Sequence, residues 1–333
     1  MKSVKIGDIN IENPVSLSPM AGFSSLPFRV ICNQMGAGYS PTELVSARSI
    51  RYNGIGKSLR YMRISPSEEG ITAIQLFGSE PEDFEAAIET ILSTPVLQEV
   101  SIFDINMGCP VPKVIKTGSG SALMEDPARA ALIVKACKKA LEGACRKVPV
   151  TVKTRTGYNA EDKGKPDFAK ALADAGADMI CVHGRTRPQM YHGRSSNSAI
   201  AVMREAVRDY DIPFFANGDI SDAGSAKKIF EETGCDGIMI GRAARGNPWV
   251  FGQVIAGLNG KEVPAEPDAD AKKAMLLREL EGRIRYLPED VAVREFRCVM
   301  PFYIKGLPGS STMKVRLCNA CTLNEVQEIL DLA

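Results

Sequence analysis

The chain has 333 residues, of which 44% are hydrophobic and 24% are charged, and its formal net charge is +1. These proportions are ordinary for a globular protein that buries a large core. The near-neutral charge excludes a global attraction for nucleic acid or membranes, so any polyanionic partner must be met by local patches.

Targeting and disulfide signals are missing from the sequence. No stretch approaches the ~20 apolar residues of a membrane-spanning helix. Pro14 and Pro19 interrupt the only apolar run near the N-terminus, so no signal peptide is expected. Nine cysteines, an odd number, favour free thiols. We therefore expect a cytoplasmic protein without a membrane partner, and we predict no protein partner.

Short apolar runs alternate along the chain with longer stretches of helical periodicity. We predict strands at 15–18, 39–44, 72–76, 101–106, 150–154, 179–182, 214–216 and 237–240. Helices are predicted between them, for example at 81–93, 127–141, 165–175, 196–207 and 223–233. This alternation predicts an α/β fold, a (β/α)8 TIM barrel. A doubly wound sheet is disfavoured because the turn after the first strand, SPMAGF, lacks the G-x-G-x-x-G pattern.

The last quarter of the chain differs from the rest. Residues 258–272 shift to Pro, Asp, Glu and Ala, which is typical of a linker. Helical patterns follow at 274–287, 289–304 and 323–332. We expect a barrel domain at 1–257, a linker at 258–272 and a small helical domain at 273–333.

Polar and glycine residues follow the predicted strands, where a barrel builds its active site. These residues are Pro19, Met20, Ala21, Gln75, Asn106, Cys109, Lys153, His183, Arg185, Asn217, Gly218, Asp219, Gly241 and Arg242. Gly-containing turns after strands seven and eight, with Arg242 beside them, favour a cofactor that carries a phosphate.

Single residues in this set allow two interpretations each. Lys153 is either a solvated rim charge or a cation that stabilises negative charge on a bound ring such as a reduced flavin. Gln75 could hydrogen-bond the same ring through its amide. His183 is either a core histidine or a ligand-facing one. Neither histidine has neighbours at metal-ligand spacing, and Cys318-Asn-Ala-Cys321 is a lone pair of cysteines, so we expect no metal.

Cys109 lies outside its strand, between Gly108 and Pro110, and before a Gly-rich segment that could act as a lid. A buried, packed thiol is one interpretation. A nucleophile would need a neighbouring base, and none is evident. A free thiol has a pKa of about 8.5 and is mostly protonated near pH 7. The role of proton donor is therefore preferred.

Seven motifs together resemble those of the tRNA-dihydrouridine synthases, and more closely the bacterial B-type branch. In order, they are PMAGFSSLPFR (19–29), QLFGSEPEDF (75–84), DINMGCPVPKVIKTGSGSALM (104–124), PVTVKTRTG (149–157), VHGRTR (182–187), PFFANGDI (213–220) and DGIMIGRAARGNPW (236–249). The run VREFRCVMPFYIKGLPGS (293–310) resembles the C-terminal helical domain of the family.

The resemblance implies a barrel that holds FMN, uses NADPH to reduce it, and then reduces the C5=C6 bond of a uridine in tRNA. It implies that Cys109 is the proton donor and that Asn106 and Arg185 lie near the uracil or flavin. The FMN site would consist of Pro19, Met20, Ala21, Gln75, Lys153, His183, Asn217, Gly218, Asp219, Gly241 and Arg242. The helical domain would help to clasp tRNA, in line with ten basic against five acidic residues between 272 and 316.

Two alternative functions remain open, and the sequence departs from the family pattern at one place. The same barrel could serve a small-molecule flavin reductase acting on a free pyrimidine, or an RNA-binding protein that has lost catalysis. The family commonly has Thr-Asp after PMAG and the following residue, whereas this chain has Ser24-Ser25. The missing acid puts local substrate or loop contacts in doubt.

Overall fold

The computed structural model describes residues 1–332, and its larger part is a barrel of parallel strands. The strand order is β3-β11-β10-β9-β8-β7-β6-β4, with β5 also paired to β6. The barrel closes between β3 and β4, where Leu17 N donates to Tyr39 O at 3.1 Å and Gly38 N donates to Val15 O at 2.9 Å. The prediction of a (β/α)8 barrel is confirmed. The strands are β3 (Val15–Leu17), β4 (Ser40–Pro41), β5 (Val45–Ser46), β6 (Thr72–Phe77), β7 (Ile102–Met107), β8 (Val150–Gly157), β9 (Met179–Thr186), β10 (Phe214–Asn217) and β11 (Gly237–Ile240).

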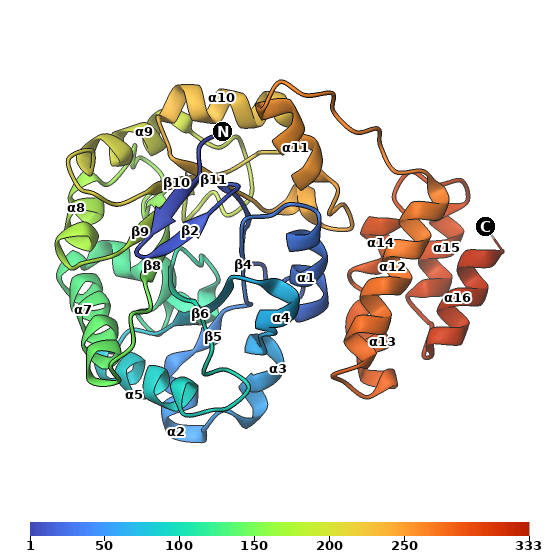
Figure 1. Cartoon of the computed structure of the whole chain (residues 1–333), viewed down its shortest axis with the longest axis horizontal. Coiled ribbons are helices and arrows are strands. Elements are labelled where there is room, and N and C mark those ends of the chain that lie inside the picture. The colour runs from blue at the N-terminus through green and yellow to red at the C-terminus, as the bar shows by residue number, and fades with distance from the viewer. Residues whose placement is uncertain (333) are drawn as a thin grey trace.

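Helices surround this barrel and cover its outer face (Figure 1). Several begin at a capping residue visible in the sequence: Asp126 accepts from Arg129 N, Ser196 accepts from Ala199 N, and Asp222 forms a capping box. The helices are α1 (Leu26–Gln34), α2 (Ala47–Asn53), α3 (Leu59–Met62), α4 (Pro66–Glu69), α5 (Pro81–Leu92), α6 (Pro112–Ile115), α7 (Pro127–Gly143), α8 (Pro166–Asp174), α9 (Asn197–Ala206), α10 (Ala223–Thr233) and α11 (Val250–Leu258).

A short hairpin that the sequence analysis did not anticipate closes the floor of the barrel. Strands β1 (Val4–Ile6) and β2 (Ile9–Ile11) pair antiparallel. Ile6 and Ile11 are fully buried against inward-facing residues such as Phe215. Three-residue strands carry too little pattern to be read from sequence. The hairpin seals the N-terminal end of the barrel, which leaves the C-terminal end for chemistry.

The predicted strand 39–44 is wrong in detail, because the chain forms two short strands there. Ser40 pairs with Thr72, and Val45 pairs with Leu76. The chain therefore advances five residues from Ser40 to Val45 while β6 advances four residues. The hydroxyl of Thr42 takes up the mismatch by accepting from Gln75 N at 3.0 Å. This is the geometry of a bulge, and it lies at the rim beside the candidate site.

Residues after 268 form a separate helical cluster with its own buried core. It contains α12 (Ala269–Ile284), α13 (Glu289–Phe296), α14 (Met300–Tyr303), α15 (Ser310–Leu317) and α16 (Leu323–Asp331). Helix α12 begins inside the predicted linker because Asp268 caps it by accepting from Ala271 N. The predicted helix 289–304 is broken, with Pro301 in the first turn of α14.

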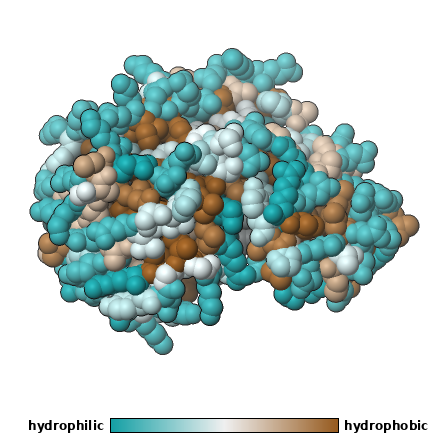
Figure 2. Space-filling model, turned by 60° about the horizontal axis from the view of Figure 1, so that its bottom comes forward, coloured by the Kyte–Doolittle hydropathy of each residue, from teal (hydrophilic) through white to brown (hydrophobic). Residues whose placement is uncertain are grey.

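The helical cluster packs on α1 of the barrel through α12. Gly282 is needed at this contact, since a Cβ there would lie 2.7 Å from Pro27 Cβ. The Arg245 guanidinium lies 5.2 Å from the ring centre of Phe23 and 4.4 Å from that of Phe302. Figure 2 shows hydrophilic residues along the line where the two parts meet. Among residues 1–332, no helix has the length and apolar character needed to cross a membrane.

Candidate active site

A buried hydrogen-bonded chain of side chains occupies the ends of strands β6, β7 and β8. Gln75 Nε2 donates to Asp104 Oδ2 at 2.6 Å, and Asn106 Nδ2 donates to Gln75 Oε1 at 3.0 Å. Thr151 Oγ1 donates to the other oxygen of Asp104 at 2.5 Å. Both amides therefore have fixed orientations, because each oxygen and nitrogen faces a partner of one kind.

Asp104 accepts two of these hydrogen bonds, and its side chain is fully buried. Burial raises the pKa of its carboxyl to about 6, although the bonds from Thr151 and Gln75 and the charge of Lys153 work in the opposite direction. A buried carboxylate that accepts two hydrogen bonds holds the Gln75 amide rigidly at the barrel mouth.

Lys153 and Asn217 connect strands β8 and β10 across the mouth. Lys153 Nζ donates to Asn217 Oδ1 at 3.0 Å, and Asn217 Nδ2 donates to Met239 O at 2.7 Å. Burial lowers the pKa of Lys153 from its usual 10.5. An ammonium has three protons, so Lys153 has donors left for an electronegative atom in the mouth.

His183, Arg185, Asp219 and Arg242 form a second cluster on β9 and the following loops. Asp219 accepts from Arg185 Nη2 and from Arg242 Nη2, both at 2.8 Å. Burial raises the pKa of its carboxyl, but the hydrogen bond from Ser195 N and the two arginines outweigh burial and lower that pKa below its usual range. Burial and the surrounding cations lower the pKa of His183 well below 6.5. His183 Nε2 lies 3.4 Å from Arg185 Nη1, and it accepts because a guanidinium cannot.

Tight turns bring the remaining predicted residues to the same rim. Gly218 has φ +139° and Asp219 has φ +51°, a turn that suits glycine and aspartate. Met20 N donates to Ser24 Oγ at 2.9 Å, which folds the loop that carries Pro19, Met20 and Ala21. A Cβ on Gly241 would lie 3.9 Å from Met20 Sδ, so the loops after the first and last barrel strands adjoin.

Cys109 is held at the rim by its neighbours. Asn106 Oδ1 accepts from Cys109 N at 2.9 Å, and Cys109 O accepts from Ser121 N at 3.1 Å. The bond between Ser121 and Cys109 ties the two ends of the expected lid segment together, and α6 forms within it. Burial raises the pKa of the Cys109 thiol, against smaller opposing effects of the Val111 amide and the charge of Arg155. The thiol is therefore protonated at neutral pH.

Asp104 belongs to the site but is not among the residues selected from the sequence. Arg155 follows Lys153 at the end of the fifth predicted strand, but the sequence assigns it no role. Arg155 Nε donates to Gly108 O at 2.7 Å, and its Nη1 donates to Met190 O at 3.0 Å. The available signals were a charged residue inside the apolar runs FDIN and VTVKTR, where both faces of a strand are buried.

Ser24 and Ser25, the departure from the family pattern, have different environments. Ser24 is fully buried and its hydroxyl accepts from Met20 N, a role that threonine could also fill. Ser25 precedes α1 as its N-cap but makes no capping hydrogen bond, and its buried Oγ has no partner among residues 1–332. The missing acid is thus a missing helix cap rather than a missing residue of the hydrogen-bonded site.

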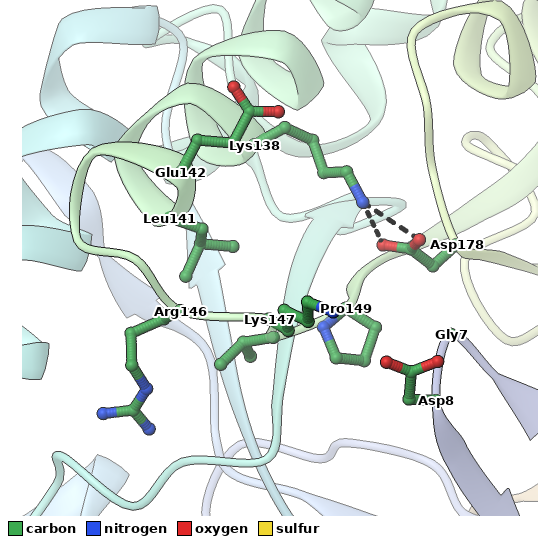
Figure 3. Close-up of a pocket in the computed structure, with 10 residues that line it drawn as sticks. Gly7, Asp8, Lys138, Leu141, Glu142, Arg146, Lys147, Pro149 and Asp178 are labelled. Carbon is green, nitrogen blue, oxygen red and sulfur yellow. Dashed lines mark hydrogen bonds and ion pairs between the residues drawn. The ribbon is translucent and has the colours of Figure 1, made fainter.

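A cavity of about 370 Å³ lies at the opposite end of the barrel (Figure 3). Gly7 and Asp8 of the β1–β2 turn, Pro149 before β8 and Asp178 before β9 line it. Lys138 is turned toward Asp178 and bonds both carboxylate oxygens, at 2.9 and 2.7 Å. This cavity belongs to the floor and is separate from the rim site. Within residues 1–332 no group of three or more His, Cys, Asp or Glu side chains could hold a metal ion.

Residues 16–332 match the family model of the dihydrouridine synthases (Dus). The chain is 35% identical over 317 residues to tRNA-dihydrouridine synthase B of Pseudomonas putida, covering 95% of this chain and 90% of that one. It is 36% identical over 311 residues to tRNA-dihydrouridine synthase B of Xanthomonas axonopodis pv. citri, covering 93% of this chain and 90% of that one.

Solved structures share the fold at low identity. A 2-naphthoyl-CoA reductase complex superposes with a TM-score of 0.58 at 10% identity, covering 78% of this chain and 52% of that one. The structure of TcOYE with pHBA gives 0.56 at 10% identity, covering 81% and 95%. These likenesses support the barrel alone. The extent of the family match and the identity to its curated members confirm the resemblance read from the motifs: the chain belongs to the dihydrouridine synthase family, in its B-type branch.

Proposed function

We propose that this protein is an FMN-dependent tRNA-dihydrouridine synthase that reduces the C5=C6 bond of specific uridines, with NADPH as the reductant. The observation that carries the proposal is the position of the Cys109 thiol at the same rim as the Lys153–Asn217 pair. Asn106 holds Cys109 N, and Arg155 holds the carbonyl oxygen of the preceding Gly108. Membership of the family supports both the reaction and tRNA as the substrate. A cytoplasmic location is proposed with this function.

The donor set at the rim fits a flavin. Gln75 and Lys153 present an oriented amide and an ammonium, groups suited to the carbonyl and nitrogen edge of an isoalloxazine ring. The turns at Gly218 and Gly241, with Arg242, suit a phosphate. Pro19, Met20, Ala21, His183, Asn217 and Asp219 complete the proposed FMN site. When bound, the flavin supplies the hydride.

Protein side chains would then stabilise the negative charge on the uracil and supply the proton. Hydride addition at C6 of the uracil leaves negative charge that is delocalised to the C4 carbonyl oxygen. Cys109 would give its Sγ proton to C5, and the thiolate would regain a proton from solvent. The second N–H of Asn106 is free of Gln75 and is proposed to bind a uracil carbonyl.

Arg185 is proposed to support the substrate pocket rather than to bind the base directly. Its side chain is 2% exposed, and it donates to His192 O, Gly193 O and Asp219. It therefore orders the loop above the rim. The uridine must leave its stack to reach this site, at a cost of a few kcal/mol, and residues 273–333 are proposed to grip the RNA while this happens.

The test uses purified protein and tRNA from cells that lack it. Heat denaturation should release FMN, and anaerobic NADPH should bleach the bound flavin. Adding the tRNA should reoxidise it and produce dihydrouridine, which mass spectrometry detects as a gain of two hydrogens. Reoxidation by free uracil but not by tRNA would favour a small-molecule reductase. Protein without flavin would contradict the proposal, and comparison with NADH tests the choice of reductant.

A further inference from the structure

Helices α2 and α3 carry an exposed basic and aromatic surface that lies outside the candidate site. Residues 46–63 contain five basic residues and no acidic one, whereas the whole chain has a net charge of only +1. We define the arginine–tyrosine strip as Arg48, Arg51, Tyr52, Lys57, Arg60 and Tyr61. All six side chains belong to exposed residues.

The tyrosines of the strip are unusual because they are large and lie open to solvent. Tyr52 is 64% exposed and Tyr61 is 36% exposed. The guanidinium groups of Arg48 and Arg51 lie 5.6 and 5.3 Å from the ring centre of Tyr52. Stacked cations keep the ring in place while leaving part of it free. Single-stranded nucleic acids bind surfaces of this kind: their phosphates contact the arginines, and a base stacks on the aromatic ring.

Charge along the strip is only partly neutralised within the chain. Arg51 pairs with Asp83 at 2.9 Å and Arg60 pairs with Glu295 at 3.0 Å. Arg48 and Lys57 have no ion pair within residues 1–332. The strip therefore keeps unpaired positive charge that an anion can use.

The position of the strip connects the rim with the helical cluster. Ser46 ends β5 and is the N-cap of α2, so Arg48 lies in the first turn of that helix, beside the barrel rim. At the other end, Arg63 lies 5.3 Å from the ring centre of Tyr286, and Arg60 reaches Glu295 of α13. Figure 1 shows α2 at the lower edge of the barrel and α3 nearer to the helical cluster.

We propose that the arginine–tyrosine strip binds the sugar–phosphate backbone of the substrate tRNA and stacks one unpaired base on Tyr52. The inference rests on the proposed function, which supplies tRNA as the substrate. It extends the RNA contact from the helical cluster to the barrel wall beside the rim.

The test compares two double variants of equal net charge. Arg48→Glu with Lys57→Glu reverses the strip, and Lys227→Glu with Lys228→Glu reverses two exposed lysines on α10, on the opposite side of the barrel in Figure 1. Fluorescence anisotropy with labelled tRNA measures the dissociation constant across a salt series. The strip variant should bind at least tenfold more weakly, with a salt slope reduced by about two, while the α10 variant should stay within about twofold of wild type.

Two further measurements test whether the Tyr52 ring stacks on a base and whether the strip binds any polyanion. Tyr52→Ala should weaken binding several-fold, and Tyr52→Phe should restore it, since the ring stacks without the hydroxyl. Polyglutamate should displace tRNA poorly. Equal binding by the strip variant and wild type, equal losses in both double variants, or displacement by polyglutamate would overturn the inference. Wild-type protein that binds tRNA through the strip but forms no dihydrouridine would instead contradict the proposed function alone.

Discussion

Arg155 Nε donates a 2.7 Å hydrogen bond to the carbonyl oxygen of Gly108, the residue before Cys109. The bond joins the end of β8 to the loop that carries the thiol. A Cβ on Gly108 would lie 3.1 Å from the Thr154 carbonyl carbon, so the two segments are in close contact. The position of the Cys109 thiol thus depends on a residue of the neighbouring strand.

Arg155→Ala should therefore slow the transfer to uridine without slowing flavin reduction. Misplacement of a reacting group by about 1 Å can cost about 10²-fold in rate, so a fall of ten- to a hundredfold is expected. Stopped-flow absorbance of the flavin measures both half-reactions. Arg187→Ala is the control, because Arg187 lies over Tyr158 and donates to its carbonyl. Equal rates in Arg155→Ala and wild type would show that the bond does not position the thiol.

Cys109→Ala should abolish dihydrouridine formation while the bound flavin is still reduced by NADPH. Burial raises the thiol pKa, and the protonated thiol is the proposed active form. The rate of uridine reduction in wild type should therefore stay level up to about pH 9 and fall at higher pH. Cys109→Ser should lose that fall, because a hydroxyl does not ionise in this range. Wild-type activity in Cys109→Ala would exclude the thiol as the acid.

Lys153→Met should destabilise the negative charge that a reduced flavin would carry. Removing one preorganised donor typically costs about 10²-fold or more in rate, and the loss should appear in flavin reduction by NADPH. A lower flavin potential, measured by dye equilibration, would accompany it. Lys138→Met serves as the control, because Lys138 pairs with Asp178 at the floor of the barrel, away from the mouth. An unchanged potential would contradict this role for Lys153.

Asp104 should make the protein less stable as pH rises from about 4 to 6. Its folded-state pKa is about 6 against 3.8 for the free side chain, so the folded state binds more protons in that window. The corresponding loss is about 3 kcal/mol of unfolding free energy. Denaturant unfolding at several pH values measures it. The difference between wild type and Asp104→Asn isolates this group, and identical pH profiles would refute the assignment.

Much of the barrel could be predicted because its strands are buried on both faces. Runs such as 179–182 are then continuous apolar segments, and the polar residue that follows, His183, marks the mouth. The bonds of Arg155 to Gly108 and of Thr42 to Gln75 could not be predicted, because they depend on strand register and on a bulge. Spacing in the sequence does not specify either one.

The helical tail was harder to predict than the barrel. Its helices are short, and their ends depend on single residues such as Asp268 and Pro301. Helix α15 begins after Gly309, which has φ +66°, and its surface is mostly polar, so its apolar periodicity is weak. Local capping, rather than hydrophobic pattern, decides where these helices start.

The ring of Phe23 meets that of Phe302 edge-on at 5.4 Å, with the Arg245 guanidinium near both. Phe23 follows directly on the loop that carries Met20 and Ala21, and Arg245 follows the turn that carries Arg242. Replacing the helical tail with that of a relative would therefore disturb the rim of the proposed FMN site. A working chimera would have to carry its own matched residues at positions 23 and 245 along with the new tail.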